Sequence, residues 1–281
     1  MSSKYPSVDL DGLKTMSIHD RVSKVDVVDF ATAHAVGSSL VDFIDHLPSI
    51  LAGKDIRTVI ARIAAARESG KPLVVAMGAH VIKCGLSPLI SDMIRRGIIT
   101  ALAMNGAGAI HDSEIARFGR TSEDVVDGMR TGVFGMARET ADFVNSAAIA
   151  AAAEGLGLGE ALGRSIAESG APNADVSILA AAYEASVPVT IHVGIGCDIV
   201  HMHPSSDGGA IGEASLHDFR ILTQAMSNLG SGGVLMNVGS AVMLPEVILK
   251  AVTTLINLGF DMSGILGVNL DLCSIIGRIN R

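Results

Sequence analysis

Five short, almost continuously apolar runs constrain the fold of this chain more than any other feature of its sequence. Such runs are typical of parallel strands that are covered on both faces. Stretches with helical punctuation separate them, so we predict an α/β protein with a doubly wound, mostly parallel sheet. The predicted strands are Leu73–Met77, Ile98–Met104, Val189–Ile195, Val234–Val238 and Ile265–Leu270.

Helix start and stop signals lie between these runs. Ser87 reads as an N-cap followed by Pro88 in the first turn, and Gly97 closes that helix. The segment 121–124 opens another helix, and Pro245 starts a further one. These signals predict that helices connect the strands.

Two parts of the chain look purely helical. They are residues 1–70, especially 38–52 and 54–69, and residues 121–186, where we predict two or three inserted helices. Low-complexity sequence does not divide the chain, so we expect a single α/β domain over residues 1–281.

The apolar composition raises the question of a membrane span. Hydrophobic residues make up 49% of the 281 residues, and the mean hydropathy is +0.46. However, the longest stretch without Asp, Glu, Lys or Arg, Ile221–Pro245, contains Gln224, Asn228 and a glycine cluster. A spanning helix needs roughly 20 mainly apolar residues, so we expect no membrane span.

The net charge and the cysteines further narrow the class of protein and the compartment in which we expect it. The net charge of −8 does not suit sequence-general binding to nucleic acid. Three separated cysteines fit a reducing compartment, and the N-terminus lacks the apolar stretch of a signal peptide. We therefore expect a cytoplasmic protein.

Small and polar residues follow every predicted strand. Ligands of open α/β sheets bind at the carboxyl ends of the strands, where small residues let the ligand approach the backbone. A single junction of this kind is explained by a tight turn, but five together favour a nucleotide-sized ligand. The junction residues are Gly78, Ala79 and His80; Asn105, Gly106, Ala107 and Gly108; Asp198; Gly239 and Ser240; and Asn269 and Asp271.

A polar cluster lies at the start of the helix after the second strand. His111, Asp112 and Glu114 could supply a base or hold ribose hydroxyls. Alternatively, Asp112 and Glu114 complement the helix dipole. A dipole role explains His111 less well, because a cationic histidine is unfavourable there.

His201 and His203 raise the possibility of a metal site. They are two residues apart, and His192, Cys197 and Asp198 are close in the sequence. On an extended segment both imidazoles would share a face and could meet one ion. Because no further ligand signature accompanies them, a substrate-facing or structural role is favoured, with no metal.

Lys83 is the lysine close to a strand-end turn. It could form a Schiff base, although a contact with an anionic ligand or solvent is the commoner role. Cys84 and Cys197 could be nucleophiles, but buried, inert thiols are the default.

The order of these features resembles deoxyhypusine synthase and its bacterial relatives, over about residues 27–271. The segment from Asn105 to Glu114 is also similar to NAD-dependent ornithine cyclodeaminase domains. The stretches that carry the resemblance are 78–80, 105–109 with His111 and Asp112, 196–198, 238–240 and 269–271.

The resemblance implies a Rossmann-like sheet, NAD at the strand-end junctions, and a homotetramer. The corresponding hypothesis is an NAD-dependent enzyme that removes a hydride next to the nitrogen of a small amine or amino acid. It would be an imine-forming transferase, deaminase or cyclase in polyamine or amino-acid metabolism. In this hypothesis Lys83, His111 and Asp112 are catalytic, the junction residues hold NAD, and His201 and His203 face the substrate.

One departure changes the expected reaction. The family's catalytic lysine belongs to a Trp-Gly-Lys segment, and this chain has no tryptophan. We therefore do not expect a true deoxyhypusine synthase. The alternatives are a non-catalytic nucleotide-binding scaffold or sensor, and a metal-dependent hydrolase that uses His192, Asp198, His201 and His203.

Overall fold

A computed structural model describes residues 4–271 of the chain. Internal contacts divide it into two units, with the division between Thr58 and Val59 inside helix α2 (Leu51–Glu68). The second unit contains the sheet and all the residues of the candidate site. None of the helices in residues 4–271 has the length and apolarity needed to cross a bilayer.

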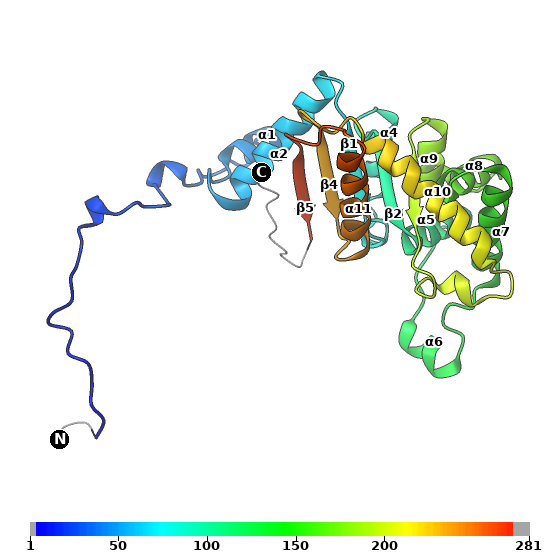
Figure 1. The fold of residues 1–281 in the computed structure, drawn as a ribbon, viewed down its shortest axis with the longest axis horizontal. Coiled ribbons are helices and arrows are strands. Elements are labelled where there is room, and N and C mark those ends of the chain that lie inside the picture. Colours follow the sequence, from blue (N-terminus) through cyan, green and yellow to red (C-terminus); the bar gives the residue numbers. More distant parts are fainter. Residues whose placement is uncertain (1–3, 272–281) are drawn as a thin grey trace. The chain divides into compact units, whose positions relative to one another are not determined.

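The sheet has five parallel strands in the order β3-β2-β1-β4-β5. The chain builds outward from β1 to β3 and then returns to the other side of β1, so the order reverses between β1 and β4 (Figure 1). This is the order of a Rossmann-like fold. The strands are β1 (Leu73–Met77), β2 (Ala101–Asn105), β3 (Val189–His192), β4 (Val234–Val238) and β5 (Leu266–Leu270).

All five predicted strands are confirmed, with different ends for three of them; β5 begins one residue later than predicted, at Leu266. β2 begins at Ala101, because Ile98 and Ile99 form the buried turn that leads into it. β3 ends at His192, because the chain turns through Gly194 and Gly196. Apolarity alone did not separate a buried turn from a strand.

Two apolar layers lie on the two faces of the sheet. Along β1, Leu73, Val75 and Met77 face one layer while Val74 and Ala76 face the other, as strand alternation requires. Helices α10 and α11 cover the second face (Figure 1). The connecting helices are α3 (His80–Lys83), α4 (Ser87–Arg95), α5 (Gly106–Phe118), α10 (Gly208–Met226) and α11 (Met243–Asn257).

The inserted section between β2 and β3 contains four α-helices after α5, where two or three were predicted. Glycines in the left-handed region end two of them, Gly132 with φ +74° and Gly155 with φ +69°. These helices pack on the first face of the sheet, apart from the short α6. They are α6 (Val125–Thr131), α7 (Arg138–Glu154), α8 (Leu158–Glu168) and α9 (Ile178–Glu184), with a 3-10 turn η3 (Ala174–Val176).

The N-terminal unit departs from the predicted helices. Its first 39 residues contain only two 3-10 turns, η1 (Ile18–Asp20) and η2 (Val27–Asp29), among those described. Ser17 and Asp26 cap these turns with their own side chains, which competes with helix formation.

The predicted helix over 38–52 is interrupted. Helix α1 (Leu40–His46) ends before Pro48, and α2 begins at Leu51. The Arg57 guanidinium donates hydrogen bonds to the carbonyl oxygens of Ile44, Leu47 and Pro48, which fixes the bend.

Side chains of α10 protect the free edge of β3. The Asp218 carboxylate accepts hydrogen bonds from the Ile191 N–H (2.8 Å) and the Gly159 N–H (3.0 Å). Ser215 Oγ accepts from the Val193 N–H and donates to the Ile191 carbonyl. The edge is thus closed to pairing with another strand. Burial raises the pKa of Asp218 to about 7, despite the backbone donors that lower it.

A substitution of Asp218 tests this arrangement. The raised pKa of the folded state means that the native protein binds a proton that the unfolded chain loses above pH 3.8. The contribution of Asp218 to stability is therefore fully present below pH 3.8 and is lost as the pH rises to about 7. We expect the difference in unfolding free energy between wild type and Asp218→Asn to fall over this window, by at most about 4 kcal/mol, and then to level off. Urea denaturation at a series of pH values measures it, and a difference independent of pH would contradict the account.

Candidate functional site

The carboxyl ends of the five strands, with the loops that follow them, form what we call the strand-end site. At its centre the loops after β1 and β4 touch. The Gly78 N–H donates a hydrogen bond to the Val238 carbonyl (2.9 Å), and a Cβ on Gly78 would lie 2.1 Å from the Gly239 carbonyl oxygen. Gly239 itself has φ +65°. Gly78 is therefore required by the close approach of two backbones at the reversal point of the sheet, and Gly239 is favoured by its left-handed conformation.

Asn237 links the ends of β4 and β5. Its Nδ2 donates to the Ser240 carbonyl (2.9 Å) and to Asn269 Oδ1 (2.7 Å). Ser240 Oγ accepts from the Leu244 N–H and so caps α11. Asn237 is 8% exposed, and its Oδ1 has no hydrogen-bond partner among the described residues. Asn237 was not among the residues predicted to hold NAD, because it lies inside an apolar run.

The start of α5 faces a carboxylate of the protein itself. Asn105 caps the helix by accepting from the Gly108 N–H (3.0 Å). Asp198, from the loop after β3, lies against Gly106, where a Cβ would be 2.1 Å from Asp198 Oδ2. Burial raises the pKa of Asp198, and His201 with the N–H groups of Gly194 and Ala107 lowers it. The predicted residues after β2 and β3 are thus brought together.

His111 belongs to a hydrogen-bond relay. Thr121 Oγ1 donates to Glu114 Oε2, and Glu114 Oε1 accepts from Thr140 Oγ1 (2.9 Å). Because the one hydroxyl hydrogen of Thr121 goes to Glu114, His111 Nδ1 donates to Thr121 Oγ1 (2.6 Å). The neutral ring therefore keeps its lone pair on Nε2. Thr121 and Thr140 come from the inserted section, and no spacing in the sequence connects them to His111.

The charge of His111 depends on burial and on nearby cations. Burial is the largest cause that lowers its pKa, and the positive charges of Lys83 and His80 lower it further, while Glu114 raises it. His111 is therefore neutral at pH 7 and able to accept a proton at Nε2. Lys83 and His80 are exposed on α3. Cys84, which follows Lys83, and Cys197 are exposed too, so the expectation of buried thiols is wrong.

Asp112 lies away from this relay, in the core. It is fully buried, and burial raises its pKa. Its carboxylate accepts from Ser177 Oγ (2.6 Å) and from the N–H groups of Ile178 (2.9 Å) and Leu179 (3.1 Å). These contacts hold the N-terminus of α9 against α5.

The two histidines of the His201–His203 pair have separate partners. His201 lies within a 3-10 turn, η4 (Ile199–Met202), and His203 follows it directly, so the two histidines do not share an extended segment. His201 Nδ1 accepts from the Gly196 N–H (3.2 Å), and His203 Nε2 contacts the Gly135 carbonyl (2.8 Å). The expectation of a shared face is therefore wrong.

His192, the third histidine of the hydrolase alternative, is buried. Its Nε2 lies 3.0 Å from Thr190 Oγ1, and burial lowers its pKa to about 4. Within residues 4–271, three or more His, Cys, Asp or Glu side chains do not gather as a metal site would require. The geometry gives the hydrolase alternative no support there.

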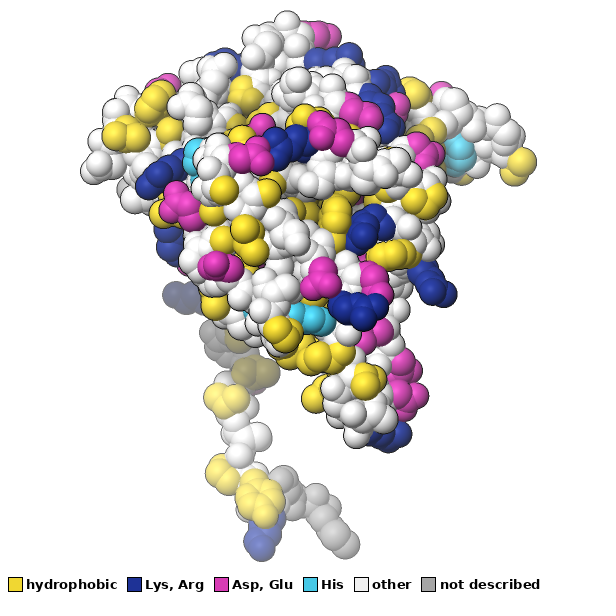
Figure 2. Space-filling model, turned by 90° about the vertical axis from the view of Figure 1, so that its right-hand side faces the viewer, with side chains coloured by type: hydrophobic (Ala, Val, Ile, Leu, Met, Phe, Trp, Pro, Cys, Tyr) yellow, Lys and Arg dark blue, Asp and Glu magenta, His cyan; other side chains and the backbone are white. Residues whose placement is uncertain are grey.

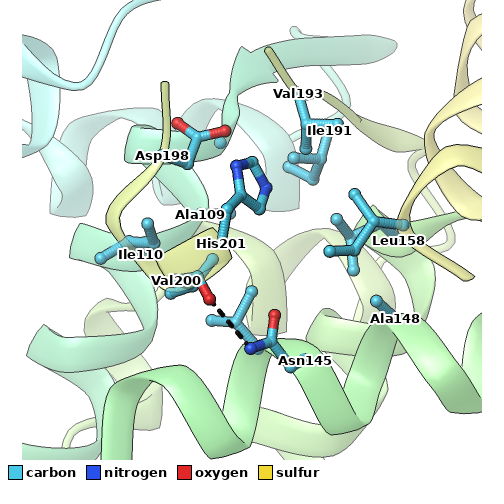
Figure 3. A pocket seen from close by; sticks show the side chains of 13 residues that line it. Ala109, Ile110, Asn145, Ala148, Leu158, Ile191, Val193, Asp198, Val200 and His201 are labelled. Carbon is cyan, nitrogen blue, oxygen red and sulfur yellow. Dashed lines mark hydrogen bonds between the residues drawn. The ribbon is translucent and has the colours of Figure 1, made fainter. Parts of the chain in front are cut away.

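A small, largely apolar cavity adjoins the strand-end site (Figure 3). It shares Gly106 and Asp198 with that site, and Figure 3 shows Asp198 and His201 on one side of it and Asn145 of α7 on the other. Its water-accessible space is about 10 Å³, which is room for one water molecule. The remaining lining residues are Ala109, Ile110, Val144, Ala148, Leu158, Ile191, Val193, Val200 and Ile211.

Figure 2 shows the face on the right-hand side of Figure 1, over the inserted helices. Lysine and arginine side chains alternate there with acidic ones and with apolar patches. This face lacks the continuous basic surface that a nucleic-acid backbone requires.

Comparisons with known proteins found solved structures that resemble this chain, but no matching sequence. Neither a protein-family model nor a curated protein matches the chain. The solved structures that it resembles include ArgZ, an arginine dihydrolase from the ornithine-ammonia cycle in Cyanobacteria, with 18% identity and a TM-score of 0.50. The match covers 79% of this chain and 28% of that one.

Two further structures have lower scores. AgrE, solved as a ternary complex with ornithine and NAD+, has 17% identity and a TM-score of 0.46, over 76% of this chain and 30% of AgrE. A protein from Entamoeba histolytica assigned as a deoxyhypusine synthase has 10% identity and a TM-score of 0.38, over 61% and 58%. The chain thus spans less than two thirds of each structure. The predicted α/β, Rossmann-like fold is confirmed.

The contact between the two glycine loops can be tested by adding one methyl group. Gly78→Ala would force the Gly239 backbone away, and we expect it to lower the unfolding free energy by about 2 kcal/mol. Gly212→Ala on α10 is the matched control. A Cβ there meets nothing within 4 Å, so we expect a neutral or slightly stabilising effect. Equal stability of the two variants in urea denaturation would contradict the close contact.

Proposed function

We propose that this protein is an NAD-dependent enzyme that removes a hydride from the carbon next to the nitrogen of a small amine or amino acid. One observation carries the proposal. A buried carboxylate, two touching glycine loops and a neutral histidine oriented as a base all lie at the strand-end side of one Rossmann-like sheet. Proteins with this fold bind ligands there.

The residues at the strand ends fit the parts of NAD. An acidic side chain near the strand ends accepts hydrogen bonds from ribose hydroxyls in such folds, and Asp198, in the loop after β3, lies against Gly106 at the end of β2. Because this carboxylate repels phosphate, we assign the pyrophosphate to the loops of Gly78 and Gly239. The unpartnered Oδ1 of Asn237 is an acceptor for a ligand N–H or O–H. When bound, NAD supplies the hydride acceptor.

The titratable groups indicate which end of the site is reactive. His80, Lys83 and His111 lie beside β1 and β2, whereas Asn237 and Asn269 contribute amides at β4 and β5. We therefore place the substrate on the β1–β2 side. His111 Nε2 accepts the proton that the substrate nitrogen loses, and the charge of Lys83 attracts an anionic group such as a carboxylate.

The other predicted residues have supporting roles in this proposal. Asp112 holds α9 against α5, and so positions His111 without moving a proton itself. His203 anchors η4 to the inserted section, and His201 lines the cavity that adjoins the strand-end site. Hydride removal leaves an imine, which a transferase, deaminase or cyclase would each use. The homotetramer and the cytoplasmic location implied by the resemblance belong to the proposal too.

The binding of NAD tests the first half of the proposal. Isothermal titration calorimetry of the full chain should show saturable binding of NAD. Asp198→Asn should weaken it by about tenfold or more, because a charged acceptor for ribose hydroxyls is lost. Asp92→Asn, at an exposed acid on α4, is the control and should bind like wild type. Equal affinity of all three proteins would contradict the role of Asp198, and no binding to wild type would contradict the use of NAD.

The turnover of amine substrates tests the second half of the proposal, the removal of a hydride. With polyamines and basic amino acids as substrates, NADH absorbance should appear, and His111→Gln should lower kcat by about 10²-fold or more without changing the affinity for NAD. Thr121→Val keeps the shape of the side chain but removes the relay, and should give a smaller loss. Wild-type activity should rise with pH through a midpoint below 6.5, the ordinary pKa of histidine, because the pKa of His111 is lowered. NAD binding without turnover of any amine would favour the non-catalytic scaffold.

A further inference from the structure

Only three of the residues that line the cavity beside His201 have polar side chains. Most of its wall is aliphatic and comes from α5, α7, β3 and α10. The exceptions are Asp198 and His201 on one side and Asn145 on the other. Figure 3 shows the imidazole of His201 over the cavity and the amide of Asn145 below it.

Asn145 has an oxygen that nothing in the described protein satisfies. The residue is 1% exposed, and its Nδ2 donates to the Val200 carbonyl (3.0 Å) and to Ser205 Oγ (3.2 Å). These bonds fix the amide, so Oδ1 cannot turn away, and it remains buried without a partner. A buried unsatisfied acceptor costs about 1–3 kcal/mol unless a small molecule donates to it.

His201 offers the complementary group. Its Nδ1 accepts from the Gly196 N–H, so the neutral ring carries its hydrogen on Nε2. A molecule in the cavity can therefore accept one hydrogen bond from His201 and donate one to Asn145. The space of about 10 Å³ restricts it to the size of water or ammonia, and the aliphatic wall disfavours a charged ammonium ion.

We propose that this cavity binds ammonia. The identity of the ligand rests on the proposed function, since hydrolysis of an imine releases it. In that step the C=N bond breaks, water supplies the oxygen of the new C=O bond, and both hydrogens of the water pass to the nitrogen. Gly106 and Asp198 belong both to the strand-end junctions and to the lining of the cavity, so the cavity is the adjacent compartment for the released nitrogen.

A binding experiment without NAD or substrate tests the site. The full chain is labelled with ¹³C-methyl alanine, and the methyl resonances of Ala109 and Ala148 are followed by NMR. Ammonium chloride should shift both resonances saturably, and more strongly as the pH rises and more of the salt is neutral ammonia. Potassium chloride at the same ionic strength should not.

Variants separate the cavity from other binding. Ala148→Val fills the cavity without touching its polar groups, and Asn145→Leu removes the acceptor; each should weaken the effect on Ala109 at least about tenfold. Ala153→Val, at an exposed position on the same helix, is the control and should behave like wild type. Circular dichroism and thermal unfolding establish that each variant is folded.

Two results would overturn the proposal. One is a wild-type protein without a saturable shift, which would leave the cavity as a site for a structural water only. The other is an unchanged response in Ala148→Val and Asn145→Leu. If ammonia binds but NAD does not, the site stands and the proposed reaction fails, so the two failures are distinguishable.

Discussion

The contact between the loops after β1 and β4 is the constraint on which the rest of the site depends. A parallel sheet that builds outward on both sides of β1 must bring these two loops side by side. Their backbones meet at the hydrogen bond from the Gly78 N–H to the Val238 carbonyl, with no room for a side chain on Gly78. Two runs more than 150 residues apart in sequence thus meet without a side chain between them, which suits a ligand that approaches peptide groups closely.

Asp198 and His111 then give one side of the strand-end site different properties from its centre. A helix N-terminus is ordinarily a place for phosphate, but at α5 the carboxylate of Asp198 already lies there. The same helix carries His111 one turn further on, where burial keeps the ring neutral and the Thr121–Glu114 relay sets its tautomer. One side of the site therefore suits hydroxyl groups and proton transfer, and the centre suits a diphosphate.

Much of the fold could be predicted from the sequence, because buried parallel strands have a short-range signature. All five runs became strands, and the small residues after them did gather at one edge of the sheet. The relay could not be predicted, since Thr121 and Thr140 are brought to Glu114 only by the packing of the inserted section. Asp112 was ambiguous for the same reason. Its neighbour in space is the start of α9, more than 60 residues away, and no spacing in the sequence predicts this contact.

The central claim is that the strand ends hold a dinucleotide. Mass spectrometry of the small molecules released when the natively purified protein is denatured tests it most directly. The account predicts NAD or NADH at close to one per chain, and predicts that Gly78→Ala, which pushes the two central loops apart, purifies with much less. A wild-type protein that releases no dinucleotide, even after incubation with excess NAD and removal of the unbound fraction, would contradict the account.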